Sequence, residues 1–183
     1  MNVVERINRW RHTKGYGVHS PLAFRFLNEA LRQPEEISYY GYECLYLLGK
    51  DNYSSITLRR ARMLLRIVSD LQAAFVWTSP EVSPLYTEAI RLAGGVIRVY
   101  DGALFPDEIT KADLVVLDGI VPESIGDVMK MEDKAIVCFS IGEEAVARLA
   151  SGLRHGILFD GVDSCVVLLR EGVSPVIYTV LRF

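Results

Sequence analysis

The stretch AAFVWTSPEVSPLY, residues 73–86, decides the fold of this chain. Its apolar run from Ala73 to Trp77 has the length and composition of a short buried strand, and a turn follows. A helix is predicted from about Pro80 to Leu92. In α/β proteins, a strand, a turn and a helix in this order form the place where a nucleotide cofactor meets the sheet. Such turns use glycine because a residue without Cβ lets the ligand approach closely, but Trp77 and Glu81 stand where small residues are expected.

The residues that follow this stretch alternate short apolar strands with helices. Strands separated by helices run parallel, joined by right-handed crossovers. Only Glu171 to Pro175 separate the last two strands, a hairpin-sized connection that predicts an antiparallel pair. The sequence therefore predicts an α/β, Rossmann-like sandwich whose mostly parallel sheet ends in an antiparallel hairpin. The predicted strands are 73–77, 96–100, 113–117, 134–139, 156–159, 165–170 and 176–183, and the predicted helices between them lie near 80–92, 106–110, 122–131 and 143–153.

The first part of the chain is predicted to be mainly helical. We expect one domain over residues 1–183, with a helical extension at 1–72 and an α/β core at 73–183. Ser20 and Pro21 have the residue types of an N-cap and a first helical position, so a helix begins there. Another helix, about 56–71, carries Arg59, Arg62 and Arg66 at three- and four-residue spacing. That row could bind phosphate, although a solvated face or ion pairs is the simpler interpretation.

The amino-acid composition of the chain limits the classes of partner that we expect it to bind. Hydrophobic residues make up 50% of the 183 residues, and the formal net charge is −3, so no global electrostatic attraction to nucleic acid or to an anionic membrane is expected. The cysteines Cys44, Cys138 and Cys165 have no metal-binding spacing and the three histidines are isolated in sequence, so no metal site is predicted. Reduced thiols and the lack of a signal-like or membrane-spanning apolar run favour a cytoplasmic protein.

Three stretches together resemble class I S-adenosylmethionine-dependent methyltransferases, in particular a group of small bacterial members with an N-terminal extension. The first is KGYGVHSPLAFRFL, residues 14–27, which is similar to that group's N-terminal signature. The second is ARMLLRIVSDLQAAFVWTSPEVSPLY, residues 61–86, similar to its helix, first strand and cofactor loop. The third is the ending, ILFDGVDSCVVLLREGVSPVIYTVLRF, residues 157–183, similar to its last strands. The resemblance implies a class I methyltransferase sandwich.

The resemblance also implies a set of cofactor-binding residues. Thr78 and Ser79 match polar positions of the first loop, and Asp118 matches an acid that in the family often lies near the methyl donor or a metal. Asp101 stands where an acid binds the ribose hydroxyls, as in other Rossmann-like sites, although a polar residue that ends a strand beside Gly102 explains it equally well. No histidine follows Asp118 as it does in the family, and no catalytic residue is identified.

Trp77 and Glu81 are the main departure from the family, because each lines up with a glycine of its cofactor loop. A tryptophan is expected to occupy volume that the amino-acid end of the donor needs. A second negative charge near the donor carboxylate costs about 1 kcal/mol or more in a partly buried site. These two residues therefore predict an altered or abandoned S-adenosylmethionine site.

Two functional hypotheses follow. In the first, the chain is a methyltransferase-like protein with a degenerate S-adenosylmethionine site that serves as a weakly active or non-catalytic binding or assembly module, acting as a homodimer. In the second, it is an active S-adenosylmethionine-dependent methyltransferase on a small-molecule acceptor, with Asp101 on the ribose and Asp118 near the reaction centre. Fold likeness alone does not decide between them.

Overall fold

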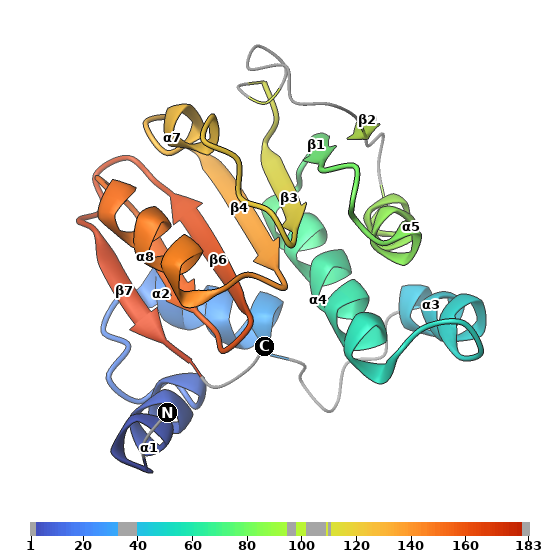
Figure 1. Cartoon of the computed structure of the whole chain (residues 1–183). Helices are drawn as coiled ribbons and strands as arrows, with labels where there is room; N and C mark the ends of the chain where they lie inside the picture. Colours follow the sequence, from blue (N-terminus) through green and yellow to red (C-terminus); the bar gives the residue numbers. More distant parts are fainter. Residues whose placement is uncertain (1–2, 33–39, 95–97, 102–108, 110, 181–183) are drawn as a thin grey trace.

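The sheet at the centre of the molecule has seven strands in the order β2-β1-β3-β4-β6-β5-β7 (Figure 1). A computed structural model describes residues 3–32, 40–94, 98–101, 109 and 111–180. The α/β, Rossmann-like architecture predicted from the sequence is confirmed in that part of the chain. The strands are β1 (Phe75–Thr78), β2 (Arg98–Asp101), β3 (Leu114–Asp118), β4 (Lys134–Phe139), β5 (Ile157–Asp160), β6 (Ser164–Leu169) and β7 (Val176–Thr179).

The sheet is mostly parallel, as predicted, but the predicted terminal hairpin is wrong. The pairs β1–β2, β1–β3, β3–β4 and β5–β7 are parallel, whereas β6 runs antiparallel to both β4 and β5. The hairpin is therefore β5–β6, closed by residues 161–163. The chain then passes around the end of β5, and β7 pairs with the far side of β5 and not with β6.

Side chains alternate along the strands and divide the core into two layers. Val76, Val116 and Val137 face a cluster that includes residues of α2 (Pro21–Phe26), η1 (Leu27–Leu31), α3 (Tyr40–Gly49), α4 (Ser55–Leu71) and α5 (Pro84–Leu92). Val115 and Ile136 face the opposite cluster, which α7 (Ile125–Val128) and α8 (Glu143–Gly152) complete. Figure 1 shows α7 and α8 on one face of the sheet and α2 and α4 on the other. This two-sided burial explains the almost continuously apolar strands.

Helix starts follow their capping residues. Ser20 accepts a hydrogen bond from the Ala23 amide (3.3 Å) and Pro21 opens α2, as predicted, after which the chain continues as the π-helical turn η1. The helix after β1 begins at Pro84, four residues later than the predicted start at Pro80, so residues 79–83 form a loop. Of the predicted helix 106–110, only Ile109 lies within the described residues.

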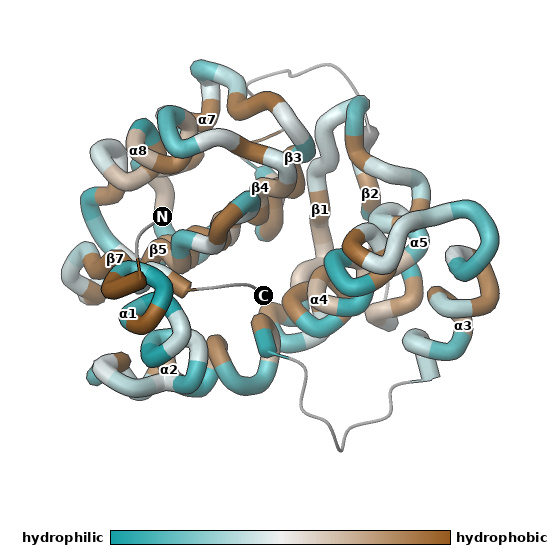
Figure 2. The backbone as a smooth tube through the Cα atoms, turned by 60° about the horizontal axis from the view of Figure 1, so that its bottom comes forward, coloured by the Kyte–Doolittle hydropathy of each residue, from teal (hydrophilic) through white to brown (hydrophobic). Residues whose placement is uncertain are grey.

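An additional helix, α1 (Val3–Thr13), lies beside β7 at the margin of the molecule, near α2 (Figures 1 and 2). The N-terminal part of the chain thereby meets its C-terminal strand. No helix of the described residues is both long enough and apolar enough to cross a lipid bilayer.

Candidate functional site

The order β2-β1-β3 creates a topological switch point, because β2 pairs with one side of β1 and β3 with the other. In open parallel sheets, ligands bind outside the carboxyl ends of the strands at such a point. Thr78 ends β1, Ser79 follows it, and Asp118 ends β3. The structure therefore brings these three sequence-predicted residues to the same edge of the sheet.

The hydroxyl groups of Thr78 and Ser79 are used within the protein. The Thr78 side chain is buried, and its Oγ1 donates to the Tyr100 carbonyl of β2 at 3.3 Å. The buried Ser79 Oγ accepts from the Asp118 amide of β3 at 3.4 Å. The Ser79 amide also donates to the Val116 carbonyl, at 2.9 Å. These contacts tie β1 to both of its neighbours where a cofactor loop would open.

The two acids lie at the ends of β2 and β3, on either side of β1, but only one side chain is described. Asp118 is half-buried, and the Gly119 that follows it has φ +81° with no atom within 4 Å of where a Cβ would stand. The backbone of Asp101 pairs in register with Thr78, while its side chain lies outside the described part of the structure. The proposed contact of Asp101 with a ribose thus stays a prediction.

Trp77 and Glu81, the expected obstacles to a cofactor, differ in their surroundings. Trp77 is 1% exposed and packs in the apolar cluster under α7 and α8, with Val115 and Leu117. Glu81 is exposed in the loop after β1. The Trp77 side chain is therefore part of the core, whereas Glu81 lies in the loop at the switch point.

One polar atom in the loop after β1 has no partner. The Oγ of Ser83, the residue before α5, is buried and makes no hydrogen bond with any described residue, although N-cap hydroxyls ordinarily accept one. An unpaired hydroxyl at a helix N-terminus beside a switch point is a place where a ligand oxygen can bind.

A polar network that the sequence did not predict lies at the carboxyl end of β4. Arg60 of α4 donates to Ser140 Oγ (3.0 Å) and to Asp163 (2.8 Å), and its guanidinium stands 5.2 Å from the centroid of the Phe139 ring. Ser140 has φ +54°, a left-handed conformation uncommon outside glycine. Burial raises the pKa of the neighbouring Tyr86 above its ordinary value, against the opposing effect of Arg60. Asp163 neutralises Arg60, so an anion would have to displace it.

The arginine row of α4 does not form one exposed surface. Arg66 is 3% exposed and donates to the carbonyls of Ala30 (2.9 Å) and Leu31 (3.0 Å) and to the Tyr42 hydroxyl (2.7 Å). These hydrogen bonds satisfy carbonyl groups at the end of η1 and link η1, α3 and α4. Neither sequence interpretation of the row predicted this structural role. Arg62 stands over the Tyr42 ring, 5.4 Å from its centroid, and Arg59 is exposed.

A hollow of about 510 Å³ lies at the carboxyl end of β5, between α1 and the start of α8. Asp160 lines it and receives a hydrogen bond from Arg9 Nη2 at 3.0 Å. Burial raises the pKa of Asp160 above its ordinary value, while the attraction of Arg9 opposes this shift. The described residues contain no group of three or more His, Cys, Asp or Glu side chains that could hold a metal ion.

Comparison with protein-family models, with curated proteins and with solved structures gave no match to this chain.

Proposed function

We propose that this chain is a methyltransferase-like protein with a closed cofactor loop that acts as a binding or assembly module. The observation that carries the proposal is the pair of hydroxyl contacts at the switch point, from Thr78 to β2 and from Ser79 to β3. A donor that enters there has to break contacts that hold the sheet together. The single antiparallel strand in an otherwise parallel sheet is consistent with the methyltransferase-like origin.

The residues present do not fit S-adenosylmethionine well. The loop from Ser79 to Ser83 contains no glycine that would let the donor approach the backbone. The Thr78 hydroxyl donates to a backbone carbonyl and the Ser79 Oγ accepts from a backbone amide, and a buried polar group that loses its hydrogen bond costs about 1–3 kcal/mol.

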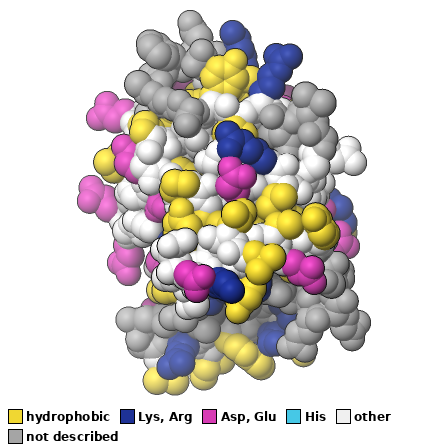
Figure 3. Space-filling view, turned by 90° about the vertical axis from the view of Figure 1, so that its right-hand side faces the viewer, with side chains coloured by type: hydrophobic (Ala, Val, Ile, Leu, Met, Phe, Trp, Pro, Cys, Tyr) yellow, Lys and Arg dark blue, Asp and Glu magenta, His cyan; other side chains and the backbone are white. Residues whose placement is uncertain are grey.

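An assembly role has support on another face. Exposed hydrophobic side chains of α3 include Tyr40 (80% exposed) and Leu47 (67%), and Figure 3 shows hydrophobic side chains gathered across this side of the molecule. Tyr46 and Leu47 border a hollow of about 420 Å³ next to Arg62. A second copy of the chain is the partner we propose for this surface.

The alternative function, methyl transfer to a small molecule, rests on separate observations. The unpaired Ser83 Oγ and the open space at Gly119 are features that a ligand at the switch point would use. Asp118 stands beside that space with a half-buried carboxylate.

Calorimetric titration of the wild-type chain with S-adenosylmethionine and S-adenosylhomocysteine tests the proposal. We expect no binding heat up to about 1 mM ligand, which corresponds to less than about 4 kcal/mol of binding free energy. The Ser79→Gly variant removes one of the two hydroxyl contacts and is expected to bind no worse than wild type. Micromolar binding by the wild type overturns the proposal, and its loss in Ser83→Ala and Asp118→Asn then supports the alternative.

Sedimentation velocity tests the assembly part separately. We expect a dimer at micromolar concentration that Leu47→Glu converts to a monomer, since a charge in an apolar interface is costly. The exposed Ile120→Glu, in the loop after β3, is the matched control and should leave the dimer unchanged. A wild-type monomer at all concentrations contradicts self-assembly.

A further inference from the structure

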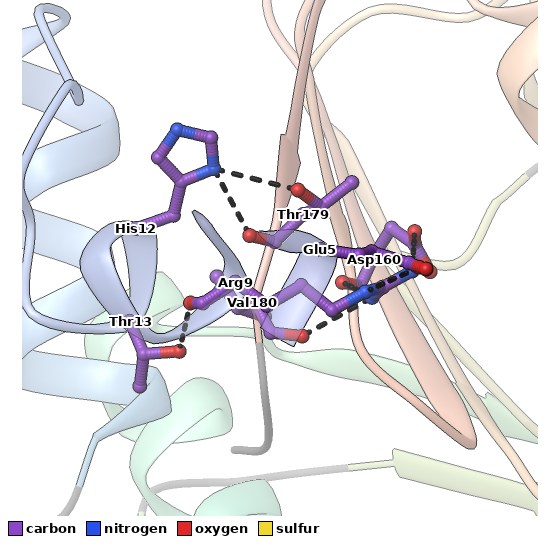
Figure 4. A network of polar contacts seen from close by, with 7 residues as sticks. All are labelled: Glu5, Arg9, His12, Thr13, Asp160, Thr179 and Val180. Carbon is purple, nitrogen blue, oxygen red and sulfur yellow. Dashed lines mark hydrogen bonds and ion pairs between the residues drawn. The ribbon is translucent and has the colours of Figure 1, made fainter. Parts of the chain in front are cut away.

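Helix α1 is attached to the rest of the molecule by its polar side. Arg9 Nη1 donates to the carbonyls of Asp160 (3.1 Å) and Val180 (3.2 Å), and Nη2 donates to the Asp160 carboxylate. The Nδ1 atom of His12 lies 3.0 Å from the Thr179 carbonyl. Figure 4 shows these side chains reaching from one side of α1 toward the ends of β5 and β7. An amphipathic helix of a globular protein ordinarily does the opposite and buries its apolar side.

The apolar side of α1 therefore faces outward. No residue of this helix is buried, and its large apolar side chains are exposed: Val3 (74%), Val4 (68%), Ile7 (51%) and Trp10 (51%). Val3, Ile7 and Trp10 follow the spacing of one helical face. With Arg6 they surround a shallow hollow of about 260 Å³. We call Val3, Val4, Ile7 and Trp10 the outer stripe.

Cations flank Val3, Ile7 and Trp10 on both sides, and Val4 of the outer stripe lies next to Arg11 on the helix surface. At about 100° per residue, Arg6 and Arg11 fall on opposite flanks of Val3, Ile7 and Trp10. Arg6, Arg11 and Lys14 are exposed, and within the described part of the chain none of them makes an ion pair. The one acid of the helix, Glu5, pairs with Arg9 (3.2 Å) on the polar side. The outward half of α1 thus carries positive charge only.

We propose that the outer stripe of α1 docks on the surface of an anionic lipid membrane, with α1 lying in the plane of the interface. A helix with Trp and aliphatic residues on one side and Arg or Lys along its borders has the character of an interfacial helix. The arginines would contact lipid phosphates while Trp10 and Ile7 enter the boundary between headgroups and acyl chains.

The arrangement favours a membrane over two other occupants. In a two-fold contact between stripes, Arg6, Arg11 and Lys14 of one copy would face the same cations of the other, and four partly covered side chains fall short of the roughly 800 Å² per partner of a stable interface. A protein that wraps an amphipathic helix would need its polar side as well, and Arg9 and His12 already hold that side. A flat anionic surface needs only the exposed half.

Membrane binding depends on the charges close to the contact and not on the net charge of the whole chain. The whole chain carries a net charge of −3, which repels an anionic surface at long range. Because interactions are screened beyond about 8–10 Å at physiological salt, the three cations at the contact decide the outcome there. Binding should therefore be reversible and should weaken as salt is raised.

Vesicle flotation tests the proposal with the full-length chain carrying no N-terminal tag. Vesicles of phosphatidylcholine alone are compared with vesicles that contain about 30% phosphatidylglycerol, a content chosen to provide strong negative charge. We expect at least about tenfold more bound protein on the anionic vesicles, and loss of binding in high salt. Tryptophan emission should shift to the blue on binding, because Trp10 is half exposed whereas Trp77 is already buried.

Charge-reversed variants separate the stripe from charge in general. Arg6→Glu with Arg11→Glu should abolish flotation, whereas Arg59→Glu with Arg154→Glu, the same charge change at two other exposed positions, should not. Trp10→Ser provides a second test that leaves the charge unchanged. No flotation of the wild type, equal flotation on neutral vesicles, or equal loss in both double variants overturns the proposal. Self-association that Trp10→Ser removes, without vesicle binding, assigns the stripe to a second copy and also overturns it.

Discussion

At the scale of single residues, the position of the Trp77 side chain distinguishes between two interpretations of the cofactor loop. In one a bulky residue blocks the loop, and in the other hydrogen bonds close it. The Trp77 side chain belongs to the apolar cluster on the face of the sheet that α7 and α8 cover, and it is among the largest fully buried side chains. We expect Trp77→Ala to lower the free energy of unfolding by about 3–5 kcal/mol, since a large cavity forms in the core. The same variant should not gain affinity for S-adenosylmethionine, because the cavity opens away from the switch point.

Urea unfolding followed by circular dichroism measures the free energy of unfolding, and calorimetry measures the affinity for S-adenosylmethionine. Trp10→Ala is the matched control, and we expect a change within about 0.5 kcal/mol because Trp10 is half exposed. A gain of donor affinity in Trp77→Ala would restore the original interpretation of Trp77 as an obstacle. That interpretation arose because a continuously apolar strand gives no sign of which residues face which side of the sheet.

At the scale of elements, the crossing of the chain around β5 depends on Gly156. This residue has φ +100°, and a Cβ there would stand 2.0 Å from the Leu168 carbonyl oxygen of β6. Its amide donates to the Val173 carbonyl at 2.8 Å, so the connection to β7 passes close by. We expect Gly156→Ala to destabilise the protein by at least about 2 kcal/mol through strain and backbone displacement.

Gly172 offers the control for this substitution. It also has a positive φ, +71°, but no atom lies within 4 Å of its Cβ position. Gly172→Ala should therefore cost only about 1–2 kcal/mol, the penalty of the left-handed conformation. Equal losses of thermal stability in the two variants would contradict the importance of the close approach at Gly156.

The same region shows what the sequence could predict and what it could not. The strand from Lys134 to Phe139 was predicted with its observed bounds, because a run of apolar residues between turn signals is a local property. The pairing of β7 was mispredicted, because Gly172 and Pro175 give the signal of a turn whether the chain returns along β6 or passes on to β5. The start of α5 was placed too early because Pro80 and Pro84 both suit a first helical turn.

Some features of the candidate site could likewise be predicted from the sequence, and others could not. The family resemblance pointed to Thr78, Ser79 and Asp118, and the structure places them at one edge because strand ends in a parallel sheet share it, while their role in binding a cofactor stays a prediction. The network of Arg60 with Asp163 joins residues 103 positions apart, and no local pattern marks such a pair. The outer stripe of α1 was missed because its apolar spacing predicts a buried face, whereas Arg9 and His12 turn that face outward.

At the scale of the whole molecule, the Arg9–Asp160 pair joins the N-terminal helix to the C-terminal strands, and its behaviour with pH can be measured. Burial raises the pKa of Asp160, with smaller contributions from Glu143 and Glu5, while Arg9 lowers it. The folded protein therefore binds the proton of Asp160 more tightly than the unfolded chain does. Lowering the pH through this raised pKa toward about 3.9, the ordinary value, should favour the folded state.

Thermal unfolding of the wild type and of Asp160→Asn between pH 7 and pH 4 isolates this contribution, since the other titrating groups affect both proteins. The melting temperature of the wild type minus that of the variant should rise as the pH falls, because only the wild type gains the proton. Arg9→Met should steepen the rise, because it removes the cation that holds the carboxylate ionised. A difference that falls toward pH 4 would mean that the attraction of Arg9 outweighs the burial of Asp160. In that case the pair would hold α1 most firmly at neutral pH, and acid would release the helix from β5 and β7.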